Sequence, residues 1–209
     1  MMCNLVAIKS KIRTHRGWLL AACLSIAMAG CSRSPRVTFY TLEPGAKVGN
    51  TFAAAGPAIA VGPVTLPELV DRPQLVMRVA ANRVEILESH RWAEPLKSEI
   101  PRLIAENLGL LLGSSRVSSY LQHASADAEY RVLVDIQRFE YSPGEAVTVE
   151  AFWSLRPAAG GTPKTGRSLV REQLVTTGYD SMVEAYGRAL RSVSADLAGA
   201  IRSEAGVKH

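Results

Sequence analysis

The amino-acid sequence predicts an α/β (mixed α+β) fold, a single domain in which a mixed, partly antiparallel sheet of about six strands is packed by two main helices. Two stretches, Arg91–Gly113 and Asp180–Ile201, carry apolar residues at steps of three and four, the spacing of a helix with one buried face. Between them, Tyr130–Leu155 alternates apolar and polar residues on both sides of a turn, which predicts a hairpin.

The N-terminal region has the order of a secretory signal. Residues 1–30 hold four Lys and Arg residues and no acidic residue, and the apolar run Trp18–Ala29 follows the basic ones. This run is shorter than the roughly 20 residues of a membrane-spanning helix. Met28-Ala29-Gly30-Cys31 is similar to the bacterial lipoprotein box, which implies that the Cys31 thiol takes a diacylglyceryl group before cleavage. We expect a signal peptide at 1–30 and lipidation at Cys31; the alternative is an ordinary cleaved signal followed by an unmodified Cys.

The charge balance changes when residues 1–30 are set apart. They hold four of the 24 Lys and Arg residues, which leaves 20 basic against 19 acidic residues and a net charge of +1. Nucleic-acid partners are therefore not expected, because phosphate contacts need clustered basic residues. Two of the three Cys residues lie in the leader, so we expect no disulfide, and no further apolar run reaches spanning length.

The segment after Cys31 starts as a tether. Ser32–Arg36 reads as linker, Val37–Leu42 as a short strand, and Gly45–Pro57 as a flexible connection rich in Gly and Ala. We therefore expect residues 31–57 to hold the lipidated Cys and the tether, and residues 58–205 to form the periplasmic domain.

Three short strands and a helix are predicted next. Ala58–Val64, Gln74–Val79 and Arg83–Glu88 are rich in apolar and β-branched residues, and Asn82 suits the turn between the second and third. Gly113 is a natural C-terminal cap for the helix that follows. Pro101 either kinks this helix or lies in the first turn of a helix capped by Ser98.

The C-terminal half predicts a three-stranded meander and a last helix. Apolar residues of Tyr130–Tyr141 share one face as far as Ile136, and Phe139 falls on the opposite face with Arg131. Further strands are predicted at Val147–Leu155 and Ser168–Thr177, with a tip at Pro157–Gly166. Asp180 is expected to cap the last helix, whose apolar stripe is Val183, Tyr186, Leu190, Val193, Leu197 and Ile201.

Catalytic, metal and cofactor motifs are not recognisable in the sequence, so we expect a protein that is not an enzyme and has no cofactor. No HExxH, CxxC, GxSxG or GxGxxG occurs. Gly160–Thr165 resembles a phosphate loop only faintly, because the spacing is wrong and no helix is predicted after it. A hydrolase would need a Ser near His123, such as Ser118 or Ser119. Acidic pairs such as Glu94 and Glu99 are expected on the solvated side of a helix.

Two stretches stand out by composition: Val61–Arg78, with the sequence VGPVTLPELVDRPQLVMR, and Arg91–Leu96, with RWAEPL. Together with the lipoprotein box, FYTL after it, AENLGLLLG and the closing amphipathic helix, they resemble the bacterial auxiliary lipoproteins of ABC-type transport systems, represented by the lipoprotein of the paraquat-inducible (Pqi) system. The resemblance implies MCE-type lipid transport between membranes, with an MCE-domain protein and a permease as partners. Ser32 after Cys31 favours the outer membrane, facing the periplasm.

The same stretches predict a protein-docking surface. Its residues are apolar, held by Pro, or Arg and Trp, which dominate the centres of interfaces: Leu66, Pro67, Leu69, Val70, Asp71, Arg72, Arg91 and Trp92. Two alternatives remain open: Asp71-Arg72-Pro73 as an ion-paired turn, and Trp92 as a core residue at the helix start. The surface could also close a homo-oligomer ring. The leading hypothesis is a lipid-anchored auxiliary component of an ABC/MCE-type transport system; the alternative is a lipoprotein regulator of another envelope enzyme, such as a cell-wall synthase.

Overall fold

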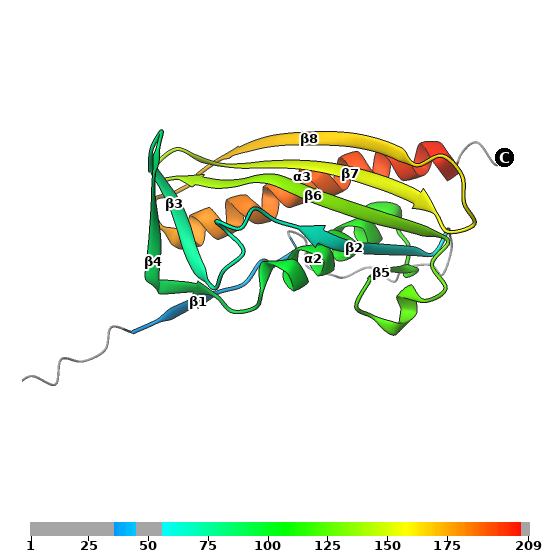
Figure 1. Ribbon diagram of the computed structural model, residues 1–209, viewed down its shortest axis with the longest axis horizontal. Helices are drawn as coiled ribbons and strands as arrows, with labels where there is room; N and C mark the ends of the chain where they lie inside the picture. Colours follow the sequence, from blue (N-terminus) through cyan, green and yellow to red (C-terminus); the bar gives the residue numbers. More distant parts are fainter. Residues whose placement is uncertain (1–35, 45–55, 206–209) are drawn as a thin grey trace, which may run out of the picture. The chain divides into compact units, whose positions relative to one another are not determined.

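The computed structural model describes residues 36–44 and 56–205 (Figure 1). The predicted signal peptide, Cys31, most of the predicted tether and the connection at 45–55 lie outside these residues. The described residues from Val37 onward belong to one compact unit. In the described residues this unit holds two helices and eight strands, which confirms the predicted α+β class with a mixed sheet.

The strands of the described residues form two sheets rather than one. The larger sheet consists of β2 (Ile59–Thr65), β5 (Val117–Ser119), β6 (Tyr130–Ser142), β7 (Ala146–Pro157) and β8 (Lys164–Gln173). Its order is β5-β2-β6-β7-β8. Strand β2 is parallel to β5 and β6, and β6, β7 and β8 form the predicted antiparallel meander. The segment between the first helix and β6 therefore contains a crossover, through β5 and the short helix η1 (His123–Ser125).

The smaller sheet has three strands in the order β1-β4-β3 and lies at one end of the larger sheet (Figure 1). It consists of β1 (Thr38–Tyr40), β3 (Gln74–Ala80) and β4 (Arg83–Trp92). Strand β1 runs parallel to β4, whereas β3 and β4 form an antiparallel hairpin. The predicted third strand ended at Glu88, but β4 continues to Trp92 because its last residues pair with β1. The short strand predicted within Val37–Leu42 is thus confirmed, and it pairs into the smaller sheet of the domain.

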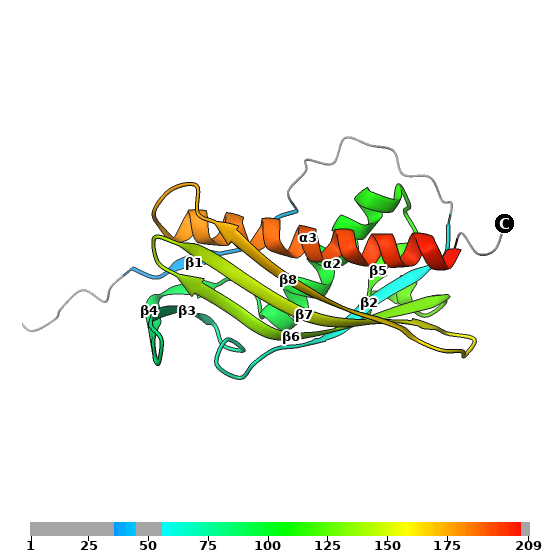
Figure 2. The same cartoon turned by 90° about the horizontal axis from the view of Figure 1, so that it is seen from above.

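The two described helices, α2 (Leu96–Leu112) and α3 (Tyr179–Ala205), cover one face of the larger sheet (Figure 2). Helix α2 begins five residues later than predicted, because β4 extends to Trp92 and Pro95 precedes the first turn. Pro101 lies inside α2, and no side chain caps its start, so Ser98 is not the cap. Gly113 ends α2 with φ 64°, as predicted, in the left-handed conformation that glycine adopts without steric cost.

Strand β6 does not keep one alternation along its length. Val132, Val134 and Ile136 are buried, as predicted. The register with β7 then shifts between Ile136 and Arg138, which is a β-bulge. The bulge turns Phe139 inward, so the prediction that Phe139 faces away with Arg131 is wrong. An extra residue inverts every later position of a strand, and the sequence pattern does not mark it.

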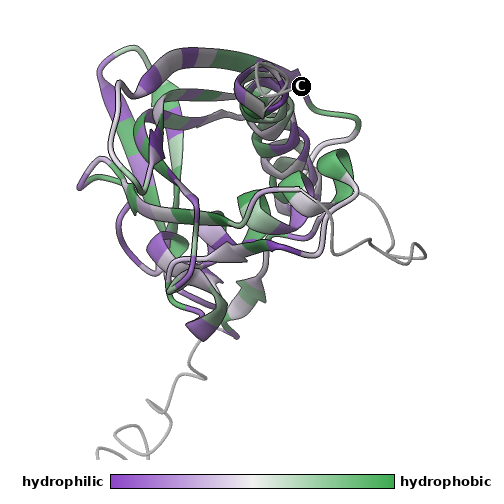
Figure 3. Cartoon of the chain, turned by 90° about the vertical axis from the view of Figure 1, so that its right-hand side faces the viewer, coloured by the Kyte–Doolittle hydropathy of each residue, from purple (hydrophilic) through white to green (hydrophobic). Residues whose placement is uncertain are grey.

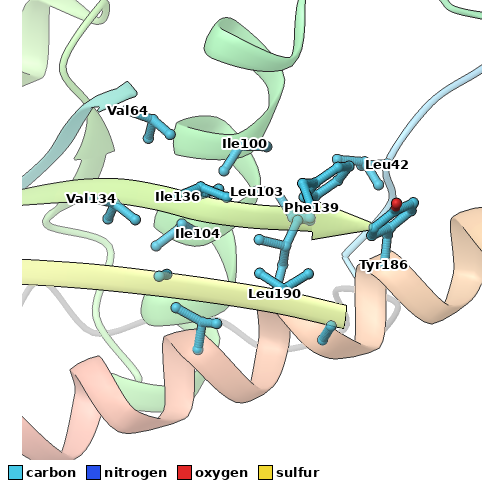
Figure 4. Packing of buried hydrophobic residues seen from close by; sticks show 14 of the residues in the cluster. Leu42, Val64, Ile100, Leu103, Ile104, Val134, Ile136, Phe139, Tyr186 and Leu190 are labelled. Carbon is cyan, nitrogen blue, oxygen red and sulfur yellow. The ribbon is translucent and has the colours of Figure 1, made fainter. Parts of the chain in front are cut away.

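Buried side chains from both helices and from β2, β6 and β7 fill the core (Figure 4). Phe139 of β6 stacks on Tyr186 of α3 with ring centroids 3.9 Å apart and planes 2° from parallel. Burial raises the pKa of the Tyr186 hydroxyl far above its usual range. Seen from the end where α3 finishes, the curved sheet and the helices surround this core (Figure 3). The predicted stripe of α3 is buried from Tyr186 to Ile201, and Val183 is half-buried.

Strand β8 starts earlier than predicted, at Lys164, and ends at Gln173 rather than Thr177. Its pairing with β7 explains the early start. Gly166 lies opposite Trp153, and a Cβ atom at Gly166 would come within 2.2 Å of the Trp153 ring. The Trp153 Nε1 donates to Ser168 Oγ at 3.1 Å. Gly166 therefore lies within β8, and its lack of a side chain leaves room for the Trp153 indole.

Candidate functional site

The loop between β2 and β3 forms a hydrogen-bonded turn. The backbone N–H groups of Val70 and Asp71 donate to the Pro67 carbonyl at 3.0 and 3.2 Å, and the Arg72 N–H donates to the Val70 carbonyl at 2.9 Å. The turn directs Val70 into the core, where it is 8% exposed, and leaves Leu69 37% exposed. Of the two adjacent apolar residues predicted for docking, Leu69 is therefore the one on the surface.

Leu69 borders an apolar groove between this loop and the β3–β4 hairpin. The groove has a volume of about 70 Å³, and its walls include Pro67, Leu69, Val76 and Val84. Ile86 pairs with Val76 across the hairpin and is 38% exposed. Because cross-strand partners project to the same face, Ile86 extends the apolar surface beyond the groove. We call Pro67, Leu69, Val76, Val84 and Ile86 the Leu69 surface.

Charged residues of the hairpin and β6 line one side of the groove. Arg78 forms an ion pair with Glu140 at 2.8 Å, and Arg138 reaches the other oxygen of the same carboxylate at 2.9 Å. Burial opposes ionisation of Glu140, but hydrogen bonds from Arg138 and Arg78 hold the pKa of its carboxyl below the usual value. The apolar groove is therefore bordered by a carboxylate that stays charged near neutral pH.

The other predicted site residues divide between surface and core. Asp71 pairs with Lys97 of α2 at 2.6 Å, and the structure thus contains an ion pair at the predicted turn, although its partner is not Arg72. Arg72 is half-buried, and its Nε is buried without a hydrogen-bond partner among the described residues. Leu66 is half-buried and packs against the core.

The two predicted stretches meet in space at Trp92. Its backbone N–H donates to the Pro73 carbonyl at 2.7 Å. The Trp92 ring is 6% exposed and lies edge-on to Phe139 and Tyr186, with centroids 6.4 and 6.2 Å away. The indole is thus a core residue in the structure. Arg91, the next residue back, is half-buried and pairs with Glu88 at 3.6 Å.

Half-buried Val76 and Val84 and exposed Ile86 belong to the Leu69 surface but are absent from the docking residues predicted from the sequence. Each lies in a correctly predicted strand, and period-two alternation marks two faces of a strand without telling which is buried. Only the packing of the smaller sheet beside β6 decides that this face of the hairpin borders the loop of Leu69.

Glu99 of α2 is fully buried, so its predicted place on the solvated side of a helix is wrong. Its Oε1 accepts a hydrogen bond from the Leu42 N–H at 2.6 Å, and Oε2 has no partner among the described residues. Burial raises the pKa of the Glu99 carboxyl, while the bond from Leu42 and the charge of Arg102 oppose the rise. The hydrogen bond from Leu42 to the Glu99 carboxyl therefore connects the segment after β1 to α2, and Leu42 is itself buried there, with 1% exposure.

The candidate nucleophiles and the candidate base of a hydrolase differ in their exposure. Ser118 and Ser119 are buried in β5, whereas His123 is exposed at η1. His90 Nδ1 shares a hydrogen bond of 2.9 Å with the Tyr40 hydroxyl. Among residues 36–44 and 56–205, no group of His, Cys, Asp and Glu has the arrangement of a metal site. The tip at Gly160–Thr165 leads into β8 rather than a helix. The described helices include none that is long and apolar enough to cross a membrane.

Comparisons with known proteins define the kinship of this fold. An uncharacterised protein of known crystal structure is 20% identical, with a TM-score of 0.66 over 80% of this chain and 99% of that one. Protein XCC0632 from Xanthomonas campestris is 16% identical, with a TM-score of 0.66 over 83% of this chain and 100% of that one. No curated protein matches the chain. The family model of the ABC-type transport auxiliary lipoprotein component matches residues 40–198, and the chain therefore belongs to this family.

Proposed function

We propose that this protein is a lipid-anchored component of an MCE-type lipid transport system that works by binding proteins at the outer membrane. Cys31 carries the anchor, the domain faces the periplasm, and the Leu69 surface docks an MCE-domain protein that acts with a permease. The observation that carries this proposal is the exposed apolar groove between the Leu69 loop and the β3–β4 hairpin.

Rigidity makes the Leu69 surface suitable for docking. Pro67 and Pro73 restrict the loop backbone, and three backbone hydrogen bonds and the Asp71–Lys97 ion pair fix its turn. A surface that is ordered before binding loses less conformational entropy when the partner arrives. Leu69 and Ile86 supply apolar area, while Arg78 and Glu140 supply a charged border that selects a complementary partner.

The proposed lipid anchor at Cys31 would hold the protein on the membrane through its acyl chains. Each buried acyl CH2 contributes about 0.8 kcal/mol, so two or three chains hold a protein on a bilayer where one chain does so only marginally. A stable anchor at Cys31 keeps the docking domain within reach of partners in the envelope.

The test is a double substitution, Leu69→Asp with Arg72→Glu, in the full-length lipoprotein. We expect the variant to lose co-purification with the MCE-domain protein of its system, because a charge is placed in the apolar centre and a basic residue becomes acidic. The matched control is Leu121→Asp. Leu121 is 61% exposed and follows β5 by two residues, and β5 lies at the opposite end of the domain from the β3–β4 hairpin (Figure 1).

Circular dichroism and membrane fractionation check that both variants fold and remain anchored. Size-exclusion chromatography with light scattering shows whether the double substitution instead breaks a homo-oligomer. The proposal fails if the folded, anchored double variant captures the MCE-domain protein as well as wild type and supports the outer-membrane barrier in a deletion strain.

A further inference from the structure

Strand β8 is the free edge of the five-stranded sheet. It pairs with β7 over ten register positions from Lys164 to Gln173. In the described part of the chain, the backbone of residues 165–172 makes no hydrogen bond apart from those with β7. One row of its backbone N–H and C=O groups therefore has no backbone hydrogen-bond partner in the described part of the chain.

Side chains of α3 contact β8 along its length, and the Ser168 hydroxyl near the middle of the strand donates to Asp196 at 2.5 Å. At one end the Lys164 ammonium donates to the Ala200 carbonyl at 3.4 Å and to the Ser203 hydroxyl. At the other end Arg188 donates to the Gln173 carbonyl at 2.8 Å. These side-chain contacts hold the curved strand β8 in position against α3 (Figure 1).

Protein sheets usually protect an edge of this length. Short edge strands, Pro residues and bulges are the common devices, since an open edge invites pairing with another chain. Strand β8 has ten residues, contains no Pro, and pairs with β7 without a register shift. Leu169 at its centre is 57% exposed. An exposed apolar residue in the middle of an edge without Pro or a bulge leaves that edge able to pair, and the charged side chains beside it restrict which strand can do so.

The outer face of β8 carries a charge pattern around Leu169. Arg167 and Arg171 lie two positions to either side, and residues two apart in a strand share one face. Arg167 pairs with Glu150 at 2.7 Å, and Arg171 pairs with Glu145 at 3.1 Å. Both guanidinium groups are more than half exposed, so these ion pairs are weak, and each guanidinium keeps donors for a further carboxylate.

This pattern discriminates between occupants of the edge. A second copy of β8, antiparallel and centred on Leu169, would place Arg167 opposite Arg171 of the other copy twice, and like charges directly opposite are destabilising. A strand with an acidic residue two positions on each side of an apolar residue would place carboxylates opposite both arginines. The pattern is symmetric, so it fits a parallel or an antiparallel strand.

We propose that the open edge of β8 binds an extended segment of a partner protein with alternating acidic and apolar residues, by adding a strand to the sheet. Main-chain hydrogen bonds along residues 165–172 supply affinity, and Arg167, Leu169 and Arg171 select the sequence. Thr165 and Arg167 of β8 border a hollow of about 620 Å³ that extends over β7, β6 and β2 on the face of the sheet. This site is separate from the Leu69 surface and does not depend on it.

The test uses the full lipoprotein in detergent and the labelled peptide Thr-Glu-Thr-Ile-Thr-Glu-Thr. We expect binding by fluorescence anisotropy and slower hydrogen exchange of the β8 amides when the peptide is present. Leu169→Asp should weaken binding at least about tenfold. The matched control, Val175→Asp, makes the same kind of change beyond the end of β8 at a residue that is 75% exposed, and should bind like wild type.

Two control peptides separate the contributions. A peptide with Lys in place of both Glu residues tests charge, and one N-methylated at alternate amides tests the main-chain hydrogen bonds; both should bind much more weakly. The proposal is overturned if the β8 amides gain no protection or if the Lys peptide binds equally well. A dimer that dissociates in Leu169→Asp but not in Val175→Asp would identify a second copy as the occupant and also overturn it.

Discussion

Leu190→Ala measures how far the closing helix contributes to stability. Leu190 is fully buried and projects from α3 into the cluster that contains Phe139 and Tyr186 (Figure 4). The substitution removes three carbon atoms from a site with no solvent-exposed surface. It changes no hydrogen bond, because the side chain is wholly apolar.

The expected loss follows from the removed atoms and the space they leave. Three buried carbons correspond to about 2.4 kcal/mol of transfer free energy at ~0.8 kcal/mol each. The stacked rings of Phe139 and Tyr186 belong to two different elements, so the site collapses little and a cavity term adds to the loss. We expect a total of about 3 to 4 kcal/mol, and a decrease in Tm of roughly 6 to 16 °C for a domain of this size.

Urea unfolding followed by circular dichroism gives the free energy, and calorimetry gives Tm. The control is Leu169→Ala, the same change at a residue that is 57% exposed, which should stay within about 0.5 kcal/mol of wild type. A Leu190→Ala variant whose Tm equals that of the Leu169→Ala control would refute the burial of the α3 stripe.

Three further predictions concern the anchor, the buried carboxyl and the β7–β8 pair. Cys31→Ser should abolish acyl labelling and release the protein from membranes; undiminished labelling would contradict the lipoprotein assignment. The pKa of Glu99 is raised in the folded protein, so ionisation of this carboxyl opposes folding as the pH rises. The stability of Glu99→Gln relative to wild type should therefore increase from pH 4.5 to 7 in urea unfolding. A difference that does not change with pH would argue against this. Gly166→Ala should cost about 1 to 3 kcal/mol because its Cβ meets Trp153, whereas Gly199→Ala, with nothing within 4 Å, should be neutral or stabilising by up to about 1 kcal/mol; equal Tm values for the two variants would contradict the contact.

Local patterns in the sequence predicted most of the secondary structure. The steps of three and four in α3 and the alternation of β6 and β7 carry this information, because periodicity records which side of an element meets apolar surroundings. Gly113 predicted the end of α2 by the same kind of local reasoning. The lipoprotein box and the basic residues before it are also local, so they indicate the lipid anchor without reference to the fold.

Tertiary structure decided the features that depend on distant residues. The bulge that turns Phe139 inward is a shift in the register between β6 and β7. Strand β4 extends to Trp92 because β1 pairs with its last residues. Glu99 is buried because Leu42, 57 positions earlier in the chain, covers it and donates to its carboxylate. Composition alone could not separate Leu69 from Val70 or Arg91 from Trp92.

The physical reason lies in how each kind of information is encoded. Whether a segment forms a helix or a strand depends largely on residues within a few positions of it, and these are adjacent in the sequence. The burial of one chosen face, the exposure of the β8 edge and the groove beside Leu69 depend on which elements pack together, and such contacts join residues far apart in the chain. The sequence by itself therefore predicts the anchor and indicated most of the elements and the family, whereas the three-dimensional packing decided which side chains are exposed.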